Sequence, residues 1–218
     1  MAMFQNIHNH KKGQNMSMHR LWGMRCYLGG PMDRAPDGGV TWRADLTPFL
    51  KSLGVIVLDP CNKPITIGTE SVEKREYRVK LKQRGAYAQM GEEIDPIRNV
   101  DLRMVDISDF LIVNLDQDIY PCGTMEEMTI ANLQLKPIFI RFKQGKVNCP
   151  DWLFAMLPHQ YIHGDWQGIK EHLAMIHADE IISEPGKRWK FFEYDRLTVS
   201  VTPEESSANA DVILKGRG

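Results

Sequence analysis

The sequence predicts an α/β fold built on a five-stranded, mainly parallel sheet with helices on both faces. Short apolar runs, typical of strands buried in such a sheet, alternate along the chain with stretches of helical periodicity. Two of these runs end directly in Gly-Gly or Asp-Pro, which are residues that break a strand. A chain that alternates in this way forms a doubly wound sheet of the flavodoxin-like or Rossmann-like kind.

Five segments are predicted to be strands. Four are short apolar runs, and a continuous apolar run fits a strand that is buried on both faces. The fifth is aromatic and lies near the C-terminus. In chain order these segments are 25–28, 55–58, 110–113, 138–140 and 189–194.

Two helices are predicted from proline at their start. Thr47-Pro48 suits the beginning of a helix and Gly54 suits its end, which places a helix over 46–53. Asp95-Pro96 is the second such start, and a helix is expected from there to Ile107. The apolar residues of that helix recur at helical spacing. They are Ile97, Val100, Met104 and Ile107.

Three further helices are expected. The stretch 71–84 is strongly charged and is predicted to be a solvated helix, and 165–176 resembles a helix capped by its first residue. The third covers 124–135 and precedes Lys136-Pro137. The residues predicted to lie along one side of it are Met125, Met128, Asn132 and Leu135.

Composition narrows the function classes. A formal net charge of −1 and a pI near 6.7 argue against a surface that coats polymeric nucleic acid. No apolar run approaches the ~20 residues that a membrane helix needs, and the N-terminus has no apolar signal core. The 4 cysteines show no CxxC spacing, so a cytoplasmic protein with reduced thiols is expected.

The chain is expected to form one domain. Its 218 residues suffice for a single well-packed core. We expect an N-terminal flexible arm over 1–20, one α/β domain over 21–200 and a polar tail over 201–218.

Ligands of such sheets bind beyond the carboxyl ends of the strands, so the residues that follow each strand deserve scrutiny. The first strand ends in Gly29-Gly30-Pro31, where glycine lets a ligand approach the backbone, although a plain tight turn explains it equally well. The motif is not GxGxxG, so a dinucleotide cofactor is not indicated. It also lacks the hydroxyl side chains of a flavodoxin-like phosphate loop.

The helix after the third strand carries adjacent carboxylates. Thr124 and Glu127 have the spacing of a capping box, in which Glu127 bonds back to its own helix. Alternatively, Glu127 lies in the first turn at the ligand-binding edge, where the helix dipole keeps it ionised for covalent glycosyl transfer. Glu126 is a rival nucleophile by chemistry. On the preceding helix, Asp101 is either a solvated flanking residue or a carboxylate that projects into a cleft.

Three motifs in this order resemble the nucleoside 2-deoxyribosyltransferase family. They are YLGGP after the first strand, Asp101 eight residues before Asp109, and GTMEEMTIA on the later helix. The family pattern G-T-x-x-E-x-x-x-A is met by Gly123, Thr124, Glu127 and Ala131. The likeness covers about 27–140.

The resemblance implies roles for these residues. Glu127 would be the nucleophile, Asp101 the carboxylate that handles the base, and Tyr27 the tyrosine beside the nucleophile. The chain departs from the family at Pro121, where the family has an Asp. Asp116 or Asp118 would then take over the contact with a sugar hydroxyl. Gly29, Gly30, Pro31, Gly123 and Thr124 would complete the substrate site.

The implied reaction is a double displacement on a nucleoside or nucleoside monophosphate, with transfer of the sugar to a free base or to water. Asp101 would be protonated to serve as the acid. Arg34 and Arg43 flank a glycine-rich loop and either grip a 5′-phosphate or are plain surface arginines. No metal or redox cofactor is required, and the resemblance implies a homo-oligomer. The alternative function is a non-catalytic nucleotide-binding sensor on the same fold.

Overall fold

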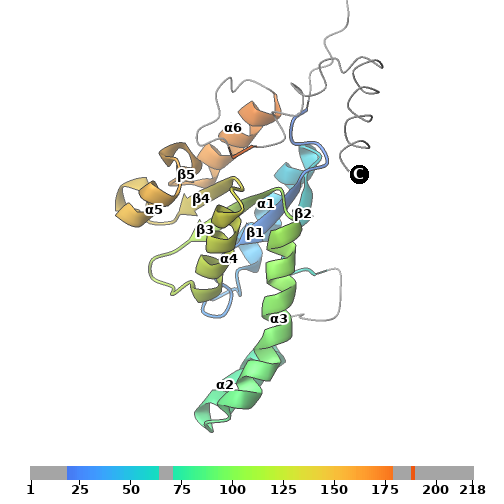
Figure 1. Cartoon of the computed structure of the whole chain (residues 1–218), viewed down its shortest axis with the longest axis vertical. Helices are drawn as coiled ribbons and strands as arrows, with labels where there is room; N and C mark the ends of the chain where they lie inside the picture. The colour runs from blue at the N-terminus through green and yellow to red at the C-terminus, as the bar shows by residue number, and fades with distance from the viewer. Residues whose placement is uncertain (1–18, 64–70, 179–187, 190–218) are drawn as a thin grey trace, which may run out of the picture.

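The computed structural model describes residues 19–63, 71–178 and 188–189, and its centre is a five-stranded parallel sheet (Figure 1). The strand order is β2-β1-β3-β4-β5, and every neighbouring pair is parallel. The predicted fold class is therefore confirmed. The strands are β1 (Arg25–Gly29), β2 (Ile56–Leu58), β3 (Phe110–Leu115), β4 (Ile138–Phe142) and β5 (Ile162–His163).

Helices cover both faces of the sheet because side chains of a strand alternate between its faces. Tyr27, Val113 and Ile140 belong to one core, which packs against α3 and α4. Leu28 and Ile112 belong to a second core, which packs against α1 and α6. The helices are α1 (Val40–Ser52), α2 (Val72–Gln83), α3 (Tyr87–Ile107), α4 (Cys122–Leu133), α5 (Asp151–Met156) and α6 (Trp166–His177), with 3-10 turns η1 (Lys146–Asn148) and η2 (His159–Tyr161).

Two helices begin earlier than the sequence predicted. Pro48 and Pro96 lie inside α1 and α3 rather than at their starts. Asp37 shows why α1 begins upstream, since its carboxylate accepts hydrogen bonds of 2.9 Å from the Gly39 and Thr41 amides. Proline removes one backbone donor from a helix, and the surrounding packing holds the helix together across that loss.

The predicted strand over 55–58 is not buried on both faces. β2 lies at an edge of the sheet, where β1 is its neighbour, and Ile56 is 52% exposed. An edge strand has one free side, which the apolar run alone does not reveal.

The fifth strand of the described sheet differs from the predicted one. Trp189 is not in a strand, and the rest of the predicted segment, 190–194, lies outside the described residues. The strand beside β4 is instead the two-residue β5. A two-residue strand leaves almost no periodic pattern to detect.

The inward side of α4 differs from the predicted one. Its buried residues are Thr124, Met128 and Ala131, whereas Met125 is 38% exposed and Leu135, which follows the helix, is 51% exposed. Only Met128 is common to the predicted and the buried sets, and the other buried residues lie one position before the predicted ones.

The helices predicted over 71–84 and 165–176 are confirmed. Their caps are the side chains of Ser71, which accepts from the Lys74 amide, and Asp165, which accepts from the Gly168 amide. Figure 1 shows α2 and the adjoining part of α3 extending away from the sheet. In the described parts of the chain, each helix is too short or too polar to cross a bilayer. The predicted polar tail and most of the predicted N-terminal arm lie outside the described residues.

Candidate functional site

Tyr27 and Glu127 meet at the carboxyl end of the sheet. The Tyr27 hydroxyl on β1 donates a hydrogen bond of 2.8 Å to Glu127 Oε1 on α4. Tyr27 is fully buried and Glu127 is half-buried. Parallel strands bring their ends together at one edge, which is how residues 100 positions apart in the sequence come into contact.

This contact replaces the capping box. α4 begins at Cys122 with Pro121 before it, and no side chain caps its amides. Thr124 therefore lies inside the helix, buried, and Glu127 lies in the second turn rather than the first. The capping-box interpretation is wrong because the N-cap is Pro121, three residues before Thr124.

Gly29 leaves room for the Glu127 carboxylate. A Cβ atom at this position would lie 3.4 Å from Glu127 Oε2 and 3.3 Å from Val113 Cγ2. A longer side chain would therefore press directly on the carboxylate. The close approach explains a glycine at the end of β1.

Burial makes Glu127 a group that titrates near neutral pH. Burial raises its pKa to about 7, although the hydrogen bond from Tyr27 and the charges of Arg43 and Lys63 act in the opposite direction. The expectation that the helix dipole keeps this carboxylate ionised is corrected, because burial outweighs the favourable neighbours. Burial, followed by the charge of Glu127, raises the pKa of Tyr27 well above its ordinary value, so Tyr27 remains a hydrogen-bond donor.

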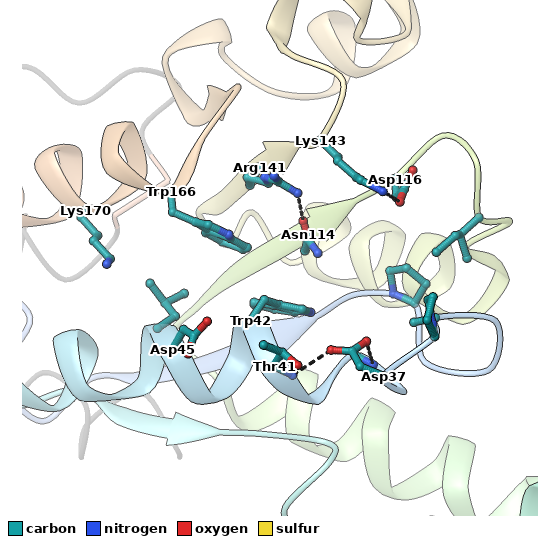
Figure 2. Close-up of a pocket in the computed structure, with 16 residues that line it drawn as sticks. Asp37, Thr41, Trp42, Asp45, Asn114, Asp116, Arg141, Lys143, Trp166 and Lys170 are labelled. Atoms are coloured by element: carbon teal, nitrogen blue, oxygen red, sulfur yellow. Dashed lines mark hydrogen bonds and ion pairs between the residues drawn. The ribbon is translucent and has the colours of Figure 1, made fainter.

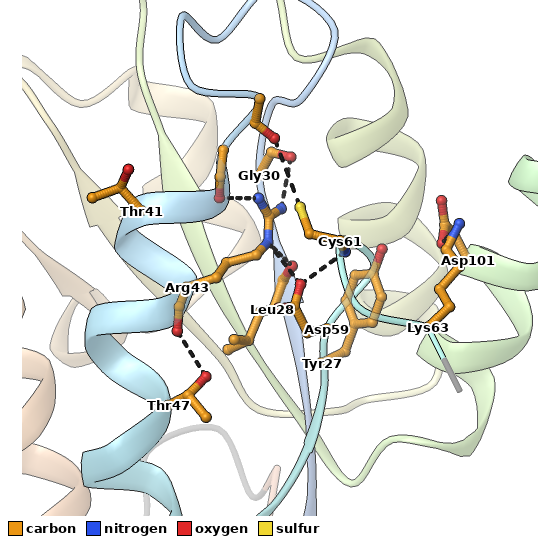
Figure 3. A network of polar contacts seen from close by, with 12 residues as sticks. Tyr27, Leu28, Gly30, Thr41, Arg43, Thr47, Asp59, Cys61, Lys63 and Asp101 are labelled. Carbon is orange, nitrogen blue, oxygen red and sulfur yellow. Dashed lines mark hydrogen bonds and ion pairs between the residues drawn. The ribbon is translucent and has the colours of Figure 1, made fainter. Parts of the chain in front are cut away.

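Asp101 lies next to this pair and is held by a lysine that the sequence analysis missed. Its Oδ1 is 2.8 Å from Lys63 Nζ (Figure 3). The Lys63 side chain is fully buried and Asp101 is 9% exposed, so the solvated-flank interpretation is wrong. The charge of Asp101 acts on both Tyr27 and Glu127. Instead of the expected protonated acid, the structure has an ion pair.

The position of Lys63 offered one usable signal. It follows β2 by five residues, at the same edge of the sheet as the other strand ends. The residues directly after each strand do not include it, because the loop after β2 carries it further along the chain. Buried lysine is rare without a partner, so the Asp101 carboxylate accounts for its burial.

Glu126, the rival nucleophile, points elsewhere. It forms a bidentate ion pair with Arg98 of α3, in which Arg98 Nε donates to Oε2 over 2.9 Å. This pair lowers the pKa of Glu126. The two neighbouring glutamates therefore differ in both contact and protonation.

Arg43 is not a surface arginine, because it is buried and binds backbone carbonyls. Its guanidinium donates to the carbonyls of Leu28, Gly30 and Gly39 at 3.1, 3.0 and 2.7 Å (Figure 3). It also lies 3.6 Å from Asp59 and is fully buried. Its donors are thus occupied by the protein, whereas Arg34 is exposed. The two arginines do not form the predicted phosphate grip.

Gly39 is required for this position of the Arg43 guanidinium. It has a φ of 76°, and a Cβ there would lie 2.4 Å from Arg43 Nη1 and 2.7 Å from the carbonyl oxygen of Pro31. Only glycine fits both the left-handed backbone and the approach of the guanidinium.

The remaining predicted binding residues are spread over the edge of the sheet. Asp116 Oδ2 accepts from Lys143 at 2.6 Å and Oδ1 from Gln144 at 2.7 Å, while Asp118 is bound by the same glutamine. Burial opposes ionisation of Asp116, but these hydrogen bonds outweigh it and lower its pKa. Pro31 and Asp116 line a cavity of about 300 Å³ (Figure 2). This cavity lies on the α1/α6 face of the sheet, whereas Glu127 lies on the other.

Gly123 is exposed and a Cβ there would meet nothing within 4 Å. Gly30 presents its carbonyl to Arg43. The structure therefore brings together Tyr27, Gly29, Asp101 and Glu127. It does not bring Pro31 and Asp116, which line the cavity on the other face, or the exposed Arg34 and Gly123 into this cluster.

Comparison with known proteins gives distant fold relatives. No protein-family model matches the sequence, and no curated protein matches it. A 2-desoxiribosyltransferase from Leishmania mexicana is 20% identical with a TM-score of 0.38, over 56% of this chain and 66% of that one. A 2-deoxyribosyltransferase from Bacillus psychrosaccharolyticus is 16% identical with a TM-score of 0.44, over 67% of this chain and 90% of that one. The chain thus spans just under two thirds of the Leishmania protein. Likenesses at this level carry no argument about activity.

Proposed function

We propose that the protein cleaves the N-glycosidic bond of a nucleoside or nucleoside monophosphate and transfers the sugar to another base or to water. The observation that carries the proposal is the half-buried Glu127 carboxylate, oriented by the Tyr27 hydroxyl at the carboxyl end of the parallel sheet. A carboxylate that is held in place at this edge, and whose ionisation changes near neutral pH, has the properties of a glycosyl nucleophile.

In the first step, a Glu127 oxygen forms a bond to the anomeric carbon of the sugar. The bond between that carbon and the base nitrogen breaks, and its electron pair leaves with the base. A glycosyl ester of Glu127 and a protonated base are the products. Tyr27 orients the nucleophile, since its hydrogen bond to Oε1 fixes the direction of attack.

The departing base takes up a proton, and we assign this proton to the Asp101–Lys63 pair. Lys63 gives an ammonium proton to the Asp101 carboxylate, and Asp101 passes that proton to the base, which leaves Lys63 neutral and Asp101 ionised. Asp101 is thus ionised in the resting protein and protonated only during the transfer, and the pair keeps a buried proton donor beside the nucleophile.

In the second step, water or an acceptor base attacks the anomeric carbon of the ester. The carbon–oxygen bond to Glu127 breaks, the carboxylate is restored, and the attacking group loses its proton to the deprotonated pair. The same residues thus act as acid and then as base, as in retaining glycosidases. A homo-oligomer and a cytoplasmic location remain predictions that accompany this proposal.

Incubation with a panel of nucleosides and monophosphates, with and without a second base, tests the proposal. Chromatography should detect free base, and exchanged nucleoside when an acceptor is present. Glu127→Gln should lower base release by about 10⁴-fold or more, as expected for loss of a nucleophile. Glu126→Gln is the matched control, since it removes the neighbouring charge and leaves the Tyr27 contact intact.

The two glutamate variants separate the possible results. Activity that survives in Glu127→Gln but not in Glu126→Gln would refute the assignment. Substrate binding without release of base by the unaltered protein would favour a nucleotide sensor instead.

A further inference from the structure

The cavity that Pro31 and Asp116 line lies on the face of the sheet opposite Glu127. Asn114 of β3 and Arg141 of β4 are register partners, and their flanking residues belong to the core under α3 and α4. Alternation along the strands therefore directs Asn114 and Arg141 toward α1 and α6. There they line the cavity of about 300 Å³, at the lower end of the size range of small-molecule sites (Figure 2).

Two indole rings form a wall of this cavity. Trp42 of α1 and Trp166 of α6 stack with centroids 5.1 Å apart and planes 12° apart. The guanidinium of Arg141 lies 5.5 Å from the centre of the Trp166 ring. Both indoles are only partly buried, so they offer aromatic surface to a ligand.

One edge of the Arg141 guanidinium is unused. Nη1 donates to Asn114 Oδ1 over 3.1 Å, which fixes the orientation of the group. Among the described residues, Nε is buried without a hydrogen-bond partner, and Nη2 has none either. The Nε–Nη2 edge is the one that binds carboxylate or phosphate oxygens in a side-on, bidentate manner. Trp42 Nε1 is a second buried donor without a partner in the described chain.

The carboxylates around Arg141 are already occupied. Asp116 binds Lys143 and Gln144, and Asp165 caps α6 through the Gly168 amide. Both raise the pKa of Arg141, although burial, the larger effect, lowers it. Asp37, Asp45 and Lys170 also line the cavity, so its charges are mixed. An anion would bind here through hydrogen bonds from the Nε–Nη2 edge of Arg141 rather than through an excess of positive charge.

We propose that this cavity is a binding site for a small organic anion, whose acidic group binds the Nε–Nη2 edge of Arg141 and whose planar body packs against Trp42 and Trp166. The site is separate from the one that contains Glu127. Carboxylate and phosphate share the required geometry, and the two are distinguished by experiment.

Nuclear magnetic resonance of the tryptophan indole N–H groups tests this site directly. The probes are benzoate and phenyl phosphate, with benzamide as the neutral ring and inorganic phosphate as the anion without a ring. We expect benzoate or phenyl phosphate to shift the Trp42 signal, assigned by its loss in Trp42→Phe. Benzamide and inorganic phosphate should bind at least about tenfold more weakly, the typical value of one charge-assisted contact.

Variants identify the residue that holds the acidic group. Arg141→Lys keeps the charge but loses the bidentate edge, and should weaken binding about tenfold. Arg103→Lys, at an exposed position of α3, is the control and should leave binding unchanged. Should Arg141→Lys fail to fold, Asn114→Ala serves instead. It removes the hydrogen bond that orients the guanidinium, so it should also weaken binding of the probes. Glu127→Gln should bind the probes like the unaltered protein, which separates this site from the proposed reaction. Equal binding of benzamide, no shift with any probe, or full binding by Arg141→Lys would overturn the proposal.

Discussion

The two faces of the sheet carry different chemistry at the same edge. On the α3/α4 face, Glu127 and Asp101 surround a buried phenol, and the charge of Glu127 changes near neutral pH. On the α1/α6 face, Arg141 and two indoles surround a cavity, and the charge of the arginine is fixed. Strand alternation is sufficient to produce this difference, since adjacent residues of one strand serve opposite faces. One edge of a parallel sheet can thus support a reacting group and a separate binding group.

Arg43 of α1 binds the carbonyls of the end of β1 and of the loop between β1 and α1. The largest stability effect is therefore expected for Arg43→Ala, which leaves three buried carbonyls and Asp59 without their donor. Loss of a buried, multiply bonded charge costs about 3–5 kcal/mol of unfolding free energy. Denaturant titration measures this loss. Arg34→Ala, on the same loop but exposed, is the control and should change stability by less than about 0.5 kcal/mol.

The titration of Glu127 predicts a pH-dependent contribution to stability from the α3/α4 face. Its pKa is about 7 in the folded protein and near 4.5 when unfolded, so the folded state binds the proton more tightly. The resulting stabilisation is complete below pH 4.5 and disappears as pH rises through 7, by up to about 3 kcal/mol. The slope is measured as the difference in unfolding free energy between the unaltered protein and Glu127→Gln at pH 5 and pH 8, because half-buried His163, whose pKa is lowered to about 4, contributes a slope of the opposite sign. Glu126→Gln should behave like the unaltered protein.

The same titration predicts the pH profile of base release. A nucleophilic Glu127 must be ionised, so the rate should rise with pH through about 7 and then level off. The measurement is the initial rate of base release between pH 5 and pH 9. A rate that falls over the range where Glu127 ionises would contradict the nucleophile assignment.

The smallest effect is expected for Tyr27→Phe. The hydroxyl lowers the pKa of Glu127, so its removal should move the midpoint of the pH profile upward. Loss of one hydrogen bond to a charged group corresponds to about a tenfold lower rate at neutral pH. A lower rate with an unchanged midpoint would assign Tyr27 to packing alone.

The sequence predicted the sheet better than it predicted the side-chain geometry. β1, β3 and β4 were recognised because an apolar run with few polar residues has one stable place, the centre of a parallel sheet. Helix starts at Pro48 and Pro96 were misplaced because proline is also tolerated inside a helix that packing holds together, and both prolines lie inside their helices. The edge position of β2 depends on tertiary pairing, which local sequence does not encode.

Within the candidate site, the resemblance and the strand-end rule together predicted that Tyr27, Asp101 and Glu127 would lie close to one another. Neither predicted Lys63 or the free edge of Arg141. Both depend on which way a side chain turns after the chain has folded, and on the partner that it meets there.

Mass spectrometry of the peptide that contains residues 122–133 tests the central claim most directly. The protein is mixed with a nucleoside substrate and no acceptor base, quenched in acid, digested and sequenced by fragmentation. We predict a mass increase equal to one sugar on Glu127, and none in Glu127→Gln. A sugar on Glu126, or turnover without any modified peptide in the unaltered protein, would contradict the account.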